Sequence, residues 1–452
     1  MRQRLFPLVL HLCILFVLMY GYEHYIAPIY GYEGYVFDPD EEGWYAALAM
    51  VTVMSLITPV AAHKPSTLFY QVMLSNVIIP MIVLFWAGNR PFEYLAQVMV
   101  AYCLVIFLPF CFKITPPHIP FASKSTLRST LFVLSCAYIV AIFAFGGGAY
   151  LNFDFTKVYE FRGEAASNLP GIFGYISPLI AKIIVPVAFV LALLQKKYGM
   201  ALIVFGATVL IFGLTAHKST IFIPFMLLFV YAASSGKHLI GKLLLGILTV
   251  LVLSVLDFWG AQHYESGYLG WTGDLMMRRM FFIPAHLNYL YYDFFSQNGP
   301  VLFSNSKVTL GLLEYPYPLD VPHLIGSEYF YDETTGANTG WLGSGYMQAG
   351  FAGLVLYAFI VAAVFKYIDA CARQSGDRAL ITAAVIAPIL AVINSADLPP
   401  AFLTHGLYIN LLLIACLSNR SSNAHSSPEQ RARAQRYPDL YQAMPQPRIT
   451  RP

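Results

Sequence analysis

Charged residues are scarce in this chain. Asp, Glu, Lys and Arg together make up 11% of its 452 residues, whereas a soluble protein would hold roughly a quarter. Hydrophobic residues make up 58%, and the mean hydropathy is +0.61. The net charge of +3 is too small to indicate a nucleic-acid partner. This composition excludes a soluble multidomain protein and predicts an integral membrane protein in contact with the lipid bilayer.

Cysteine is also rare. The chain has 6 cysteines, which lie in apolar runs except for Cys371 in a predicted cytoplasmic loop. No two of them form a Cys-x-x-Cys pair, and none is predicted to face an oxidising compartment. We therefore expect no disulfide framework, no cysteine-based catalysis, and no metal or other cofactor.

Apolar runs long enough to cross a bilayer recur along the chain. About 20 helical residues cover the hydrocarbon core. The predicted spans cover residues 5–21, 44–62, 67–87, 94–112, 127–146, 172–194, 199–215, 220–234, 239–258, 342–365, 379–396 and 401–418. We predict an all-α polytopic integral membrane protein with about twelve transmembrane helices, in one domain covering residues 1–418.

The distribution of Lys and Arg predicts the orientation. Basic loops alternate with acidic loops such as residues 23–42, which contain no Lys or Arg. By the positive-inside rule, both termini are predicted to be cytoplasmic. The apolar stretch after Arg4 lacks a small-x-small cleavage site, so it is predicted to be a retained span. Residues 419–452, rich in Ser, Gln, Pro and Arg, are predicted to be a disordered cytoplasmic tail.

Two segments on the opposite, exterior side are long enough to carry a function. They cover residues 147–171 and 259–341. Irregular segments of such length are usually functional or disordered. The second segment is rich in Tyr, Phe and Trp, which supply apolar area that a disordered tract lacks. We expect it to fold over the membrane surface.

A few cations lie outside the predicted cytoplasmic loops and need a local reason. The candidates are Arg162, Lys182, Lys218, Arg278 and Arg279. Guanidinium groups bind phosphate oxygens in bidentate fashion. These cations are therefore candidates for binding a pyrophosphate.

The paired arginines Arg278 and Arg279 precede Pro284. Proline is favoured in the first turn of a helix, so a helix is predicted from about Pro284 through Phe295. Its free amides would add to the attraction of the arginines for an anion. The alternative is that both arginines reach lipid headgroups beside an interfacial aromatic belt.

Three polar side chains share one face of that predicted helix. His286, Tyr289 and Asp293 follow the spacing i, i+3 and i+7. A hydroxyl that attacks a sugar needs a general base, and His286 and Asp293 are of the right chemical type. Glu164 in the first exterior segment is a third candidate base.

For the other candidate cations, a functional and a purely structural interpretation both stay open. Arg162 either binds an anion or forms a surface ion pair with Glu164, worth at most about 1 kcal/mol. His217 and Lys218 lie between two short predicted spans. They either contact a phosphate group or belong to a capped turn between the two helices. Lys182 lies inside a predicted span, where it either lines a polar cavity or extends to the interface; a lysine at the bilayer centre costs at least about 2.5 kcal/mol.

Residues 336–353 lead into the tenth span. Gly345, Ala349 and Gly353 recur every four residues, which is typical of a seam that lets transmembrane helices approach closely. Three residues before the seam, Asn338, Thr339 and Trp341, are candidates for binding a sugar. They could do so through hydrogen bonds and ring stacking.

At these motifs the chain resembles the bacterial O-antigen polymerases, the oligosaccharide repeat-unit polymerases of the Wzy type. The motifs are Phe161–Glu164, Ala216–Ser219, Arg278–Pro284, Leu324–Gly326 and Asn338–Gly353. The resemblance implies a metal-independent, GT-C-like glycosyltransferase of lipopolysaccharide biosynthesis in the bacterial inner membrane. Its expected substrates are undecaprenyl-pyrophosphate-linked glycans, joined on the periplasmic face, and its expected protein partner is a chain-length regulator (a polysaccharide co-polymerase).

Two alternatives share much of this pattern. An O-antigen ligase uses the same carrier lipid and hands the glycan to a lipid core. A transporter or flippase for the lipid-linked glycan would place several ionisable residues at the bilayer midplane. Only Lys182 is predicted there, and the polar residues gather in exterior segments, which favours the enzyme.

Overall fold

The computed structural model describes residues 2–39, 41–61, 63–88, 90–117, 119, 123–152, 170–215, 219–236, 238–264 and 270–418. Every regular element in these ranges is a helix, and seven helical runs are long and apolar enough to cross a membrane. This confirms the prediction of an α-helical membrane protein. Each of the predicted spans overlaps a helix, but several of those helices are shorter than a full span.

In chain order the α-helices are α1 (Arg2–Gly21), α2 (Ala27–Tyr30), α3 (Glu41–Ile57), α4 (Pro65–Met73), α5 (Ile79–Gly88), α6 (Phe92–Phe107), α7 (Lys124–Ala144), α9 (Ile172–Leu179), α10 (Val185–Leu194), α11 (Tyr198–Thr215), α12 (Ser219–Ser235), α13 (Leu239–His263), α14 (Trp271–Gly273), α15 (Ile283–Asn298), α16 (Val321–Phe330), α17 (Trp341–Ser375), α18 (Arg378–Asn394), α19 (Leu398–Leu403) and α20 (Leu407–Ser418). The π-helices are η1 (Tyr22–Ile26), η3 (Leu74–Ile78), η6 (Ile180–Ile184) and η7 (Asp274–Phe282), and the short 3₁₀ helices are η2 (Gly31–Glu33), η4 (Leu108–Phe110), η5 (Gly147–Tyr150) and η8 (Lys307–Thr309).

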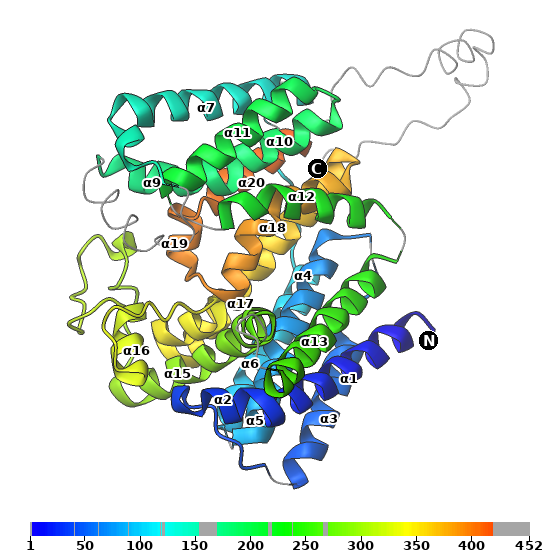
Figure 1. Ribbon diagram of the computed structural model, residues 1–452. Coiled ribbons are helices and arrows are strands. Elements are labelled where there is room, and N and C mark those ends of the chain that lie inside the picture. The colour runs from blue at the N-terminus through cyan, green and yellow to red at the C-terminus, as the bar shows by residue number, and fades with distance from the viewer. Residues whose placement is uncertain are drawn as a thin grey trace, which may run out of the picture.

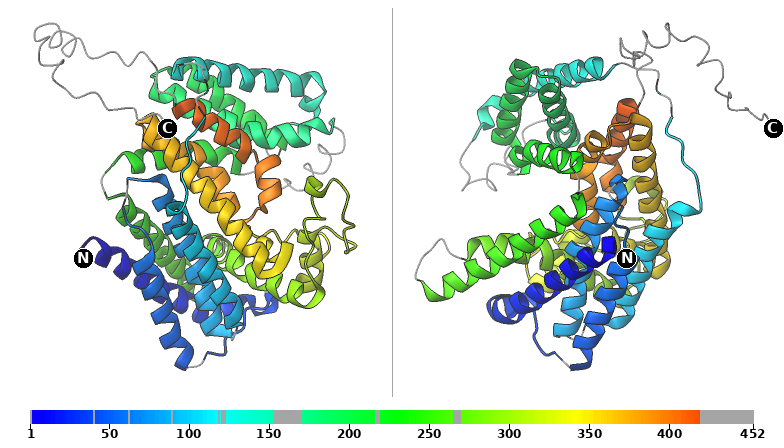
Figure 2. Two further views of the ribbon diagram at one scale, coloured as in Figure 1. Left: turned by 180° about the vertical axis from the view of Figure 1, so that it is seen from behind. Right: turned by 90° about the vertical axis from the view of Figure 1, so that its right-hand side faces the viewer.

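The helices form two groups that share α17 and α18 (Figure 1). One group contains α7, α9, α10, α11, α12 and α20, and the other contains α1, α3, α5, α6 and α13. Within and between them, α12 packs on α18, α1 on α13, and α17 on α6 and α15. On one side the groups diverge between α12 and α13 (Figure 2).

Each described π-helix ends two residues before a proline. The prolines are Pro28 after η1, Pro80 after η3, Pro186 after η6 and Pro284 after η7. Proline has no N–H to donate, and its ring clashes with the carbonyl one turn earlier. A π turn is wider and relieves this clash. The helices therefore continue through these prolines.

The predicted small-residue seam has a different role from the one expected. α17 is broken inside the seam, where Gly350 has φ +59°. A Cβ on Gly345 would lie 3.2 Å from the Cα of Leu354, and a Cβ on Gly353 would collide with the carbonyl of Gly345. The small residues let the two parts of one helix approach each other, because the sharp turn at Gly350 brings them together.

Residues 270–341, in the second of the two segments predicted to be exterior, are folded in the structure. They contribute to a small hydrophobic core of their own, comprising Leu287, Leu290, Tyr291, Phe294, Phe295, Val301, Val321, Leu324, Ile325, Ala337 and Met347. This core joins α15, α16 and the first turns of α17. It fixes the loop after α16 against α15, where the polar cavity described below is found.

Candidate functional site

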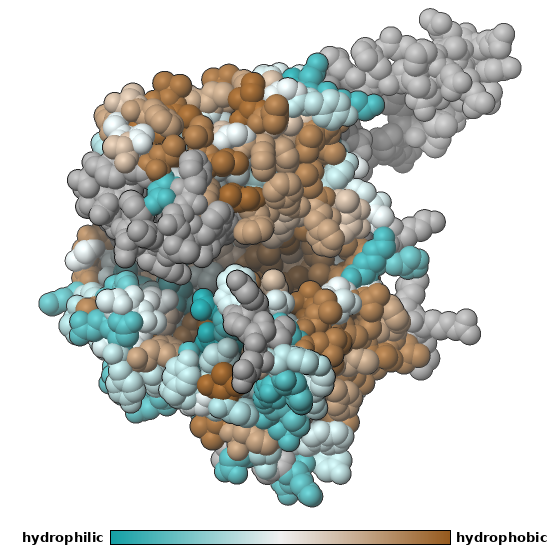
Figure 3. Space-filling model, viewed as in Figure 1, coloured by the Kyte–Doolittle hydropathy of each residue, from teal (hydrophilic) through white to brown (hydrophobic). Residues whose placement is uncertain are grey.

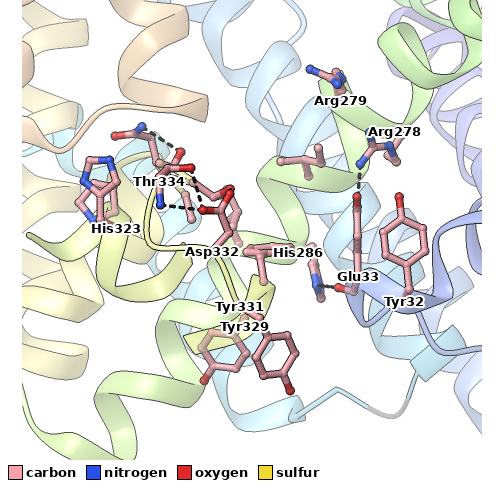
Figure 4. Close-up of a pocket in the computed structure, with 18 of the residues that line it drawn as sticks. Tyr32, Glu33, Arg278, Arg279, His286, His323, Tyr329, Tyr331, Asp332 and Thr334 are labelled. Carbon is pink, nitrogen blue, oxygen red and sulfur yellow. Dashed lines mark hydrogen bonds and ion pairs between the residues drawn. The ribbon is translucent and has the colours of Figure 1, made fainter. Parts of the chain in front are cut away.

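A polar cavity of about 1090 Å³ opens between three parts of the chain. One wall comes from residues 32–35, the second from η7 and the start of α15, and the third from α16 and the loop 331–338 (Figure 4). Half of the lining residues carry a tyrosine, carboxylate, hydroxyl or amide group, and two arginines and two histidines add further polar atoms. This lining suits a polar ligand with many hydroxyls.

Arg278 is buried in the wall formed by η7. Its Nη1 lies 2.6 Å from Glu33 Oε2, and its Nε bonds to Asp274 Oδ1. Its guanidinium carbon also lies 4.2 Å from the ring centroid of Tyr30, a cation–π contact. Two carboxylates therefore fix the orientation of Arg278 and balance its charge.

Arg279 is the exposed partner, with 55% of its side chain accessible. Its Nε lies 3.1 Å from Asp274 Oδ2. Burial by itself raises the pKa of Asp274, but its hydrogen bond to Arg278 and the charges of both arginines outweigh burial and lower that pKa. The carboxylate therefore stays ionised and holds both guanidinium groups, while Arg279 presents its remaining donors to the cavity.

The prediction that the arginines precede a helix N-terminus is wrong. Both lie inside η7, which continues directly into α15. The expected break at Pro284 does not occur, because the preceding turns widen into a π-helix. The helix begins at Trp271 after Gly270, and one of its first amides, Gly273 N, donates to Asp257 Oδ2 over 2.8 Å. No free amides of a helix N-terminus lie beside these two arginines in the described part of the chain.

His286 lies in the cavity wall, but its side chain is 2% exposed. Nε2 lies 3.0 Å from the Glu33 carbonyl oxygen, and Nδ1 lies 3.3 Å from Arg90 Nη2. A ring with N–H on Nε2 satisfies both contacts. Burial, followed by the charge of Arg90, lowers the pKa of His286 to about 3. The neutral ring, with both nitrogens engaged, is poorly placed to accept a proton from a substrate.

Tyr289 and Asp293 do not line the cavity, although they follow His286 along α15. The Tyr289 hydroxyl donates to the Met81 carbonyl over 3.1 Å within the helix core. Asp293 is exposed and accepts a 2.6 Å hydrogen bond from the hydroxyl of Tyr329, which itself lines the cavity. The structure therefore does not bring the three side chains of this helix face into one site.

The wall opposite the arginines carries a histidine–carboxylate pair. His323 Nδ1 lies 2.7 Å from Asp320 Oδ1, and 42% of the His323 side chain is accessible. Both residues line the cavity, at the start of α16. The carboxylate fixes the orientation of the ring and leaves Nε2 as the nitrogen available to a ligand.

The loop after α16 is held by its own hydrogen bonds. Asp332 accepts from the amide and hydroxyl of Thr334 and from the hydroxyl of Thr335. These bonds lower the pKa of Asp332, which is fully exposed. Tyr331, at φ +55°, is 92% exposed at the cavity rim. An aromatic face held at the edge of a polar cavity suits stacking on a sugar ring.

The predicted sugar contacts divide into one exposed residue and two buried ones. Asn338 is exposed and lines the cavity. Trp341 is fully buried, and its Nε1 donates to Met73 Sδ over 3.3 Å. Thr339 is also buried. The expectation that Trp341 stacks on a sugar is wrong, since its ring packs inside the helical core.

Several predicted site residues are not placed by the structure. Arg162, Glu164, His217 and Lys218 lie outside the described residues. Lys182 is described: it lies in η6, and its Nζ is 3.4 Å from His405 Nδ1. Lys182 thus makes a polar contact with the chain segment between α19 and α20.

Sequence reasoning missed most of the groups that surround the arginines. The missed residues are Glu33, Arg90, Asp274, Asp320 and His323. The acidic segment 23–42 contains no Lys or Arg, and this absence is a signal that its carboxylates could pair with a cation from a distant part of the chain. The signal for His323 is the Asp three positions before it, a spacing that brings two side chains together at the start of a helix.

A second hollow, the apolar groove, lies where α12 and α13 diverge. It has a volume of about 700 Å³ and is lined almost entirely by apolar side chains of α4, α12, α13 and α18. Figure 3 shows it as a hollow with a hydrophobic lining. Met280 and Phe281 of η7 also line it, directly after Arg278 and Arg279, which line the polar cavity.

No family model, curated protein or solved structure matches the chain. Among the described residues, no three His, Cys, Asp or Glu side chains lie together as a metal-binding group would require. The polar cavity and the apolar groove are joined by η7, which contributes residues to both.

Proposed function

We propose that this protein is a membrane-embedded glycosyltransferase that joins lipid-pyrophosphate-linked oligosaccharide units into a polysaccharide. In this proposal about twelve helices span the bacterial inner membrane in a GT-C-like arrangement, both termini are cytoplasmic, and the polar cavity faces the periplasm. The donor is a growing glycan on undecaprenyl pyrophosphate, and the acceptor is a single lipid-linked unit.

One observation carries the proposal. Arg278 and Arg279 line the polar cavity, and the next two residues, Met280 and Phe281, line the apolar groove. A substrate that fills both would have a long apolar chain, an anionic group at the junction and a hydroxyl-rich portion beyond it. Lipid-pyrophosphate-linked glycans have these three parts in this order.

The cations have a defined role in the proposed reaction. When the bond from the anomeric carbon to the pyrophosphate oxygen breaks, negative charge grows on the leaving group. Preorganised donors aimed at that charge stabilise the transition state. Arg279 presents its free donors, whereas Arg278 is held by Glu33 and Asp274 and fixes the position of η7. Arg162 and Lys218 stay predictions for the same role.

The histidine–carboxylate pair supplies a general base in this proposal. The acceptor hydroxyl oxygen attacks the anomeric carbon, its proton passes to His323 Nε2, and Asp320 stabilises the resulting imidazolium. The glycosidic bond forms as the bond to pyrophosphate breaks. We prefer His323 to His286 because His323 is exposed to the cavity and has one nitrogen without a described partner. Glu164 stays a prediction as an alternative base.

The decisive experiment uses purified protein with a single lipid-pyrophosphate-linked oligosaccharide as the only substrate. Oligomers of increasing length are expected, in EDTA as well as in its absence. The absence of oligomers would contradict the polymerase, and a strict requirement for a divalent metal would contradict the mechanism.

An O-antigen ligase would use the same cavity and groove, since its donor is the same class of molecule. A deletion strain separates the two enzymes. Loss of the polymerase keeps lipopolysaccharide capped with one unit and removes the long ladder, whereas loss of the ligase or of a flippase removes the single unit as well.

A further inference from the structure

We infer that the end of the helical bundle remote from the polar cavity contains a binding site for the phosphate headgroup of an anionic phospholipid. The site is a pocket of about 320 Å³, here named the basic pocket. Its basic lining residues are Arg4, His63, Lys64, Lys366 and Arg373. They come from the start of α1, the segment before α4 and the end of α17.

The basic pocket and the polar cavity lie at opposite ends of the same helices. Arg4 begins a helical run that ends at Glu33 in the wall of the polar cavity. At 1.5 Å per residue, this run of 30 residues is about 45 Å long. Figure 1 shows the start of α1 far from α2. The basic pocket is therefore a separate site on the other membrane face.

The cations are held in place by neutral groups. Arg4 Nη1 donates to the Leu56 carbonyl over 2.7 Å, Lys366 Nζ donates to the Pro109 carbonyl over 2.7 Å, and Lys64 Nζ lies 5.8 Å from the ring centroid of Phe110. Among the described residues, none of these three forms an ion pair with a carboxylate. Each of these cations has a neutral neighbour, and its charge is not cancelled by direct contact with a carboxylate.

One carboxylate lines the basic pocket, and it is already engaged. Asp369 Oδ1 accepts from the amide of Ser66 over 2.9 Å, and Oδ2 accepts from the Ser66 hydroxyl over 2.7 Å. Both oxygens therefore fasten the first turn of α4 to α17. Asp369 offsets one positive charge, and the four Lys and Arg side chains leave an excess that suits a phosphate group.

The surroundings favour a lipid over a free anion. Beside the cations, Phe107 and Phe110 are 52% and 74% exposed. Both line the basic pocket, with further apolar side chains from α3 and α6. Basic pockets between transmembrane helices bind the headgroups of anionic lipids. Exposed phenyl rings next to them would contact the first part of the acyl chains.

The experiment uses the full chain, purified in a neutral detergent and titrated with phosphatidylglycerol, with phosphatidylcholine or with inorganic phosphate alone. Native mass spectrometry measures the bound adducts. We expect phosphatidylglycerol to bind in preference to phosphatidylcholine. The double variant Lys64→Gln/Arg373→Gln should weaken phosphatidylglycerol binding roughly ten- to thirtyfold.

A matched control changes two exposed lysines on the segment between α10 and α11, as Lys196→Gln/Lys197→Gln. This control should keep the wild-type affinity, and the charge-keeping variant Lys64→Arg/Arg373→Lys should do the same. An equal loss in pocket and control variants would show diffuse surface attraction and overturn the site. Displacement of the lipid by inorganic phosphate at similar concentration would overturn the assignment to a lipid.

Discussion

Arg278 Nη1 and Glu33 Oε2 lie 2.6 Å apart, although 245 positions separate them in the chain. This contact joins the end of the first helical run to η7. It closes one corner of the polar cavity and sets the position of Arg279, because both arginines share Asp274.

Removal of Arg278 should mainly affect stability, whereas removal of Arg279 should mainly affect activity. Arg278→Ala leaves the mostly buried Glu33 without a cation and leaves Asp274 with Arg279 alone, and it should lower the free energy of unfolding by about 3 kcal/mol. Arg279→Ala should change it by less than about 1 kcal/mol but reduce glycosyl transfer roughly 10²- to 10³-fold. Thermal unfolding and the oligomer assay measure the two effects. Equal destabilisation by both variants would contradict the division of roles.

The assignment of His323 as the general base can be tested by replacing it and, as a control, another exposed histidine. His323→Ala should reduce the transfer rate roughly 10²- to 10⁴-fold with little change in melting temperature. Asp320→Asn should slow transfer in the same direction, since it removes the charge that stabilises the imidazolium. His263→Ala is the matched control, because His263 is exposed and outside the cavity lining. Full activity of His323→Ala would remove this residue from the mechanism.

His286 should make stability depend on pH. Its pKa is lowered to about 3 in the folded protein, whereas an unperturbed histidine has a pKa of about 6.5. As the pH falls below about 6.5, the unfolded chain therefore binds a proton that the folded protein excludes. The contribution is complete above that pH and is lost progressively toward pH 3, with about 2 kcal/mol gone at pH 5.

The measurement compares unfolding at pH 7 and pH 5 in wild type, His286→Gln and His263→Gln. His286→Gln should show a smaller loss of stability on acidification than wild type, whatever its stability at pH 7. His263→Gln should follow wild type. Identical pH dependence in all three proteins would show that His286 is not held neutral by its surroundings.

A large side chain at Gly246 would fill part of the apolar groove without changing any residue that lines the polar cavity. A Cβ at Gly246 on α13 meets no atom within 4 Å, and Gly246 lines the groove. Gly246→Phe should raise the KM for a donor with a long prenyl chain at least about tenfold, and should affect a short-chain donor less. Gly206→Phe on α11 is the control, since it is equally open but lies outside the groove. The same effect from both variants would count against a lipid site there.

The break in α17 depends on its small residues. Gly353→Ala should lower the free energy of unfolding by about 1 to 3 kcal/mol, because the added Cβ meets the Gly345 carbonyl. Gly199→Ala, in α11 with open space around it, should leave stability unchanged or raise it by up to about 1 kcal/mol. Melting temperatures of both variants test this. A stable Gly353→Ala protein would mean that the two parts of α17 can separate at little cost.

The helical membrane class could be predicted because it depends on local composition. Uninterrupted apolar runs with few charges can satisfy their backbone in a bilayer only as helices. The helix around residues 284–295 was also predictable, but its start was not. Pro284 is compatible with a first turn and with a π turn, and the choice depended on packing of η7 against α13 and η3.

The sequence by itself determined that this is a polytopic helical protein, that the aromatic-rich stretch within residues 270–341 would fold, and that Arg278 and Arg279 needed a local reason for their position. Only the tertiary structure decided that the partners are Asp274 and Glu33, that His286 and Trp341 are buried, and that His323 faces the cavity. The physical reason is the range of the interactions. Hydropathy and helix formation act over a few turns, whereas a cavity is assembled by side chains whose spacing along the chain says nothing of their distance in space.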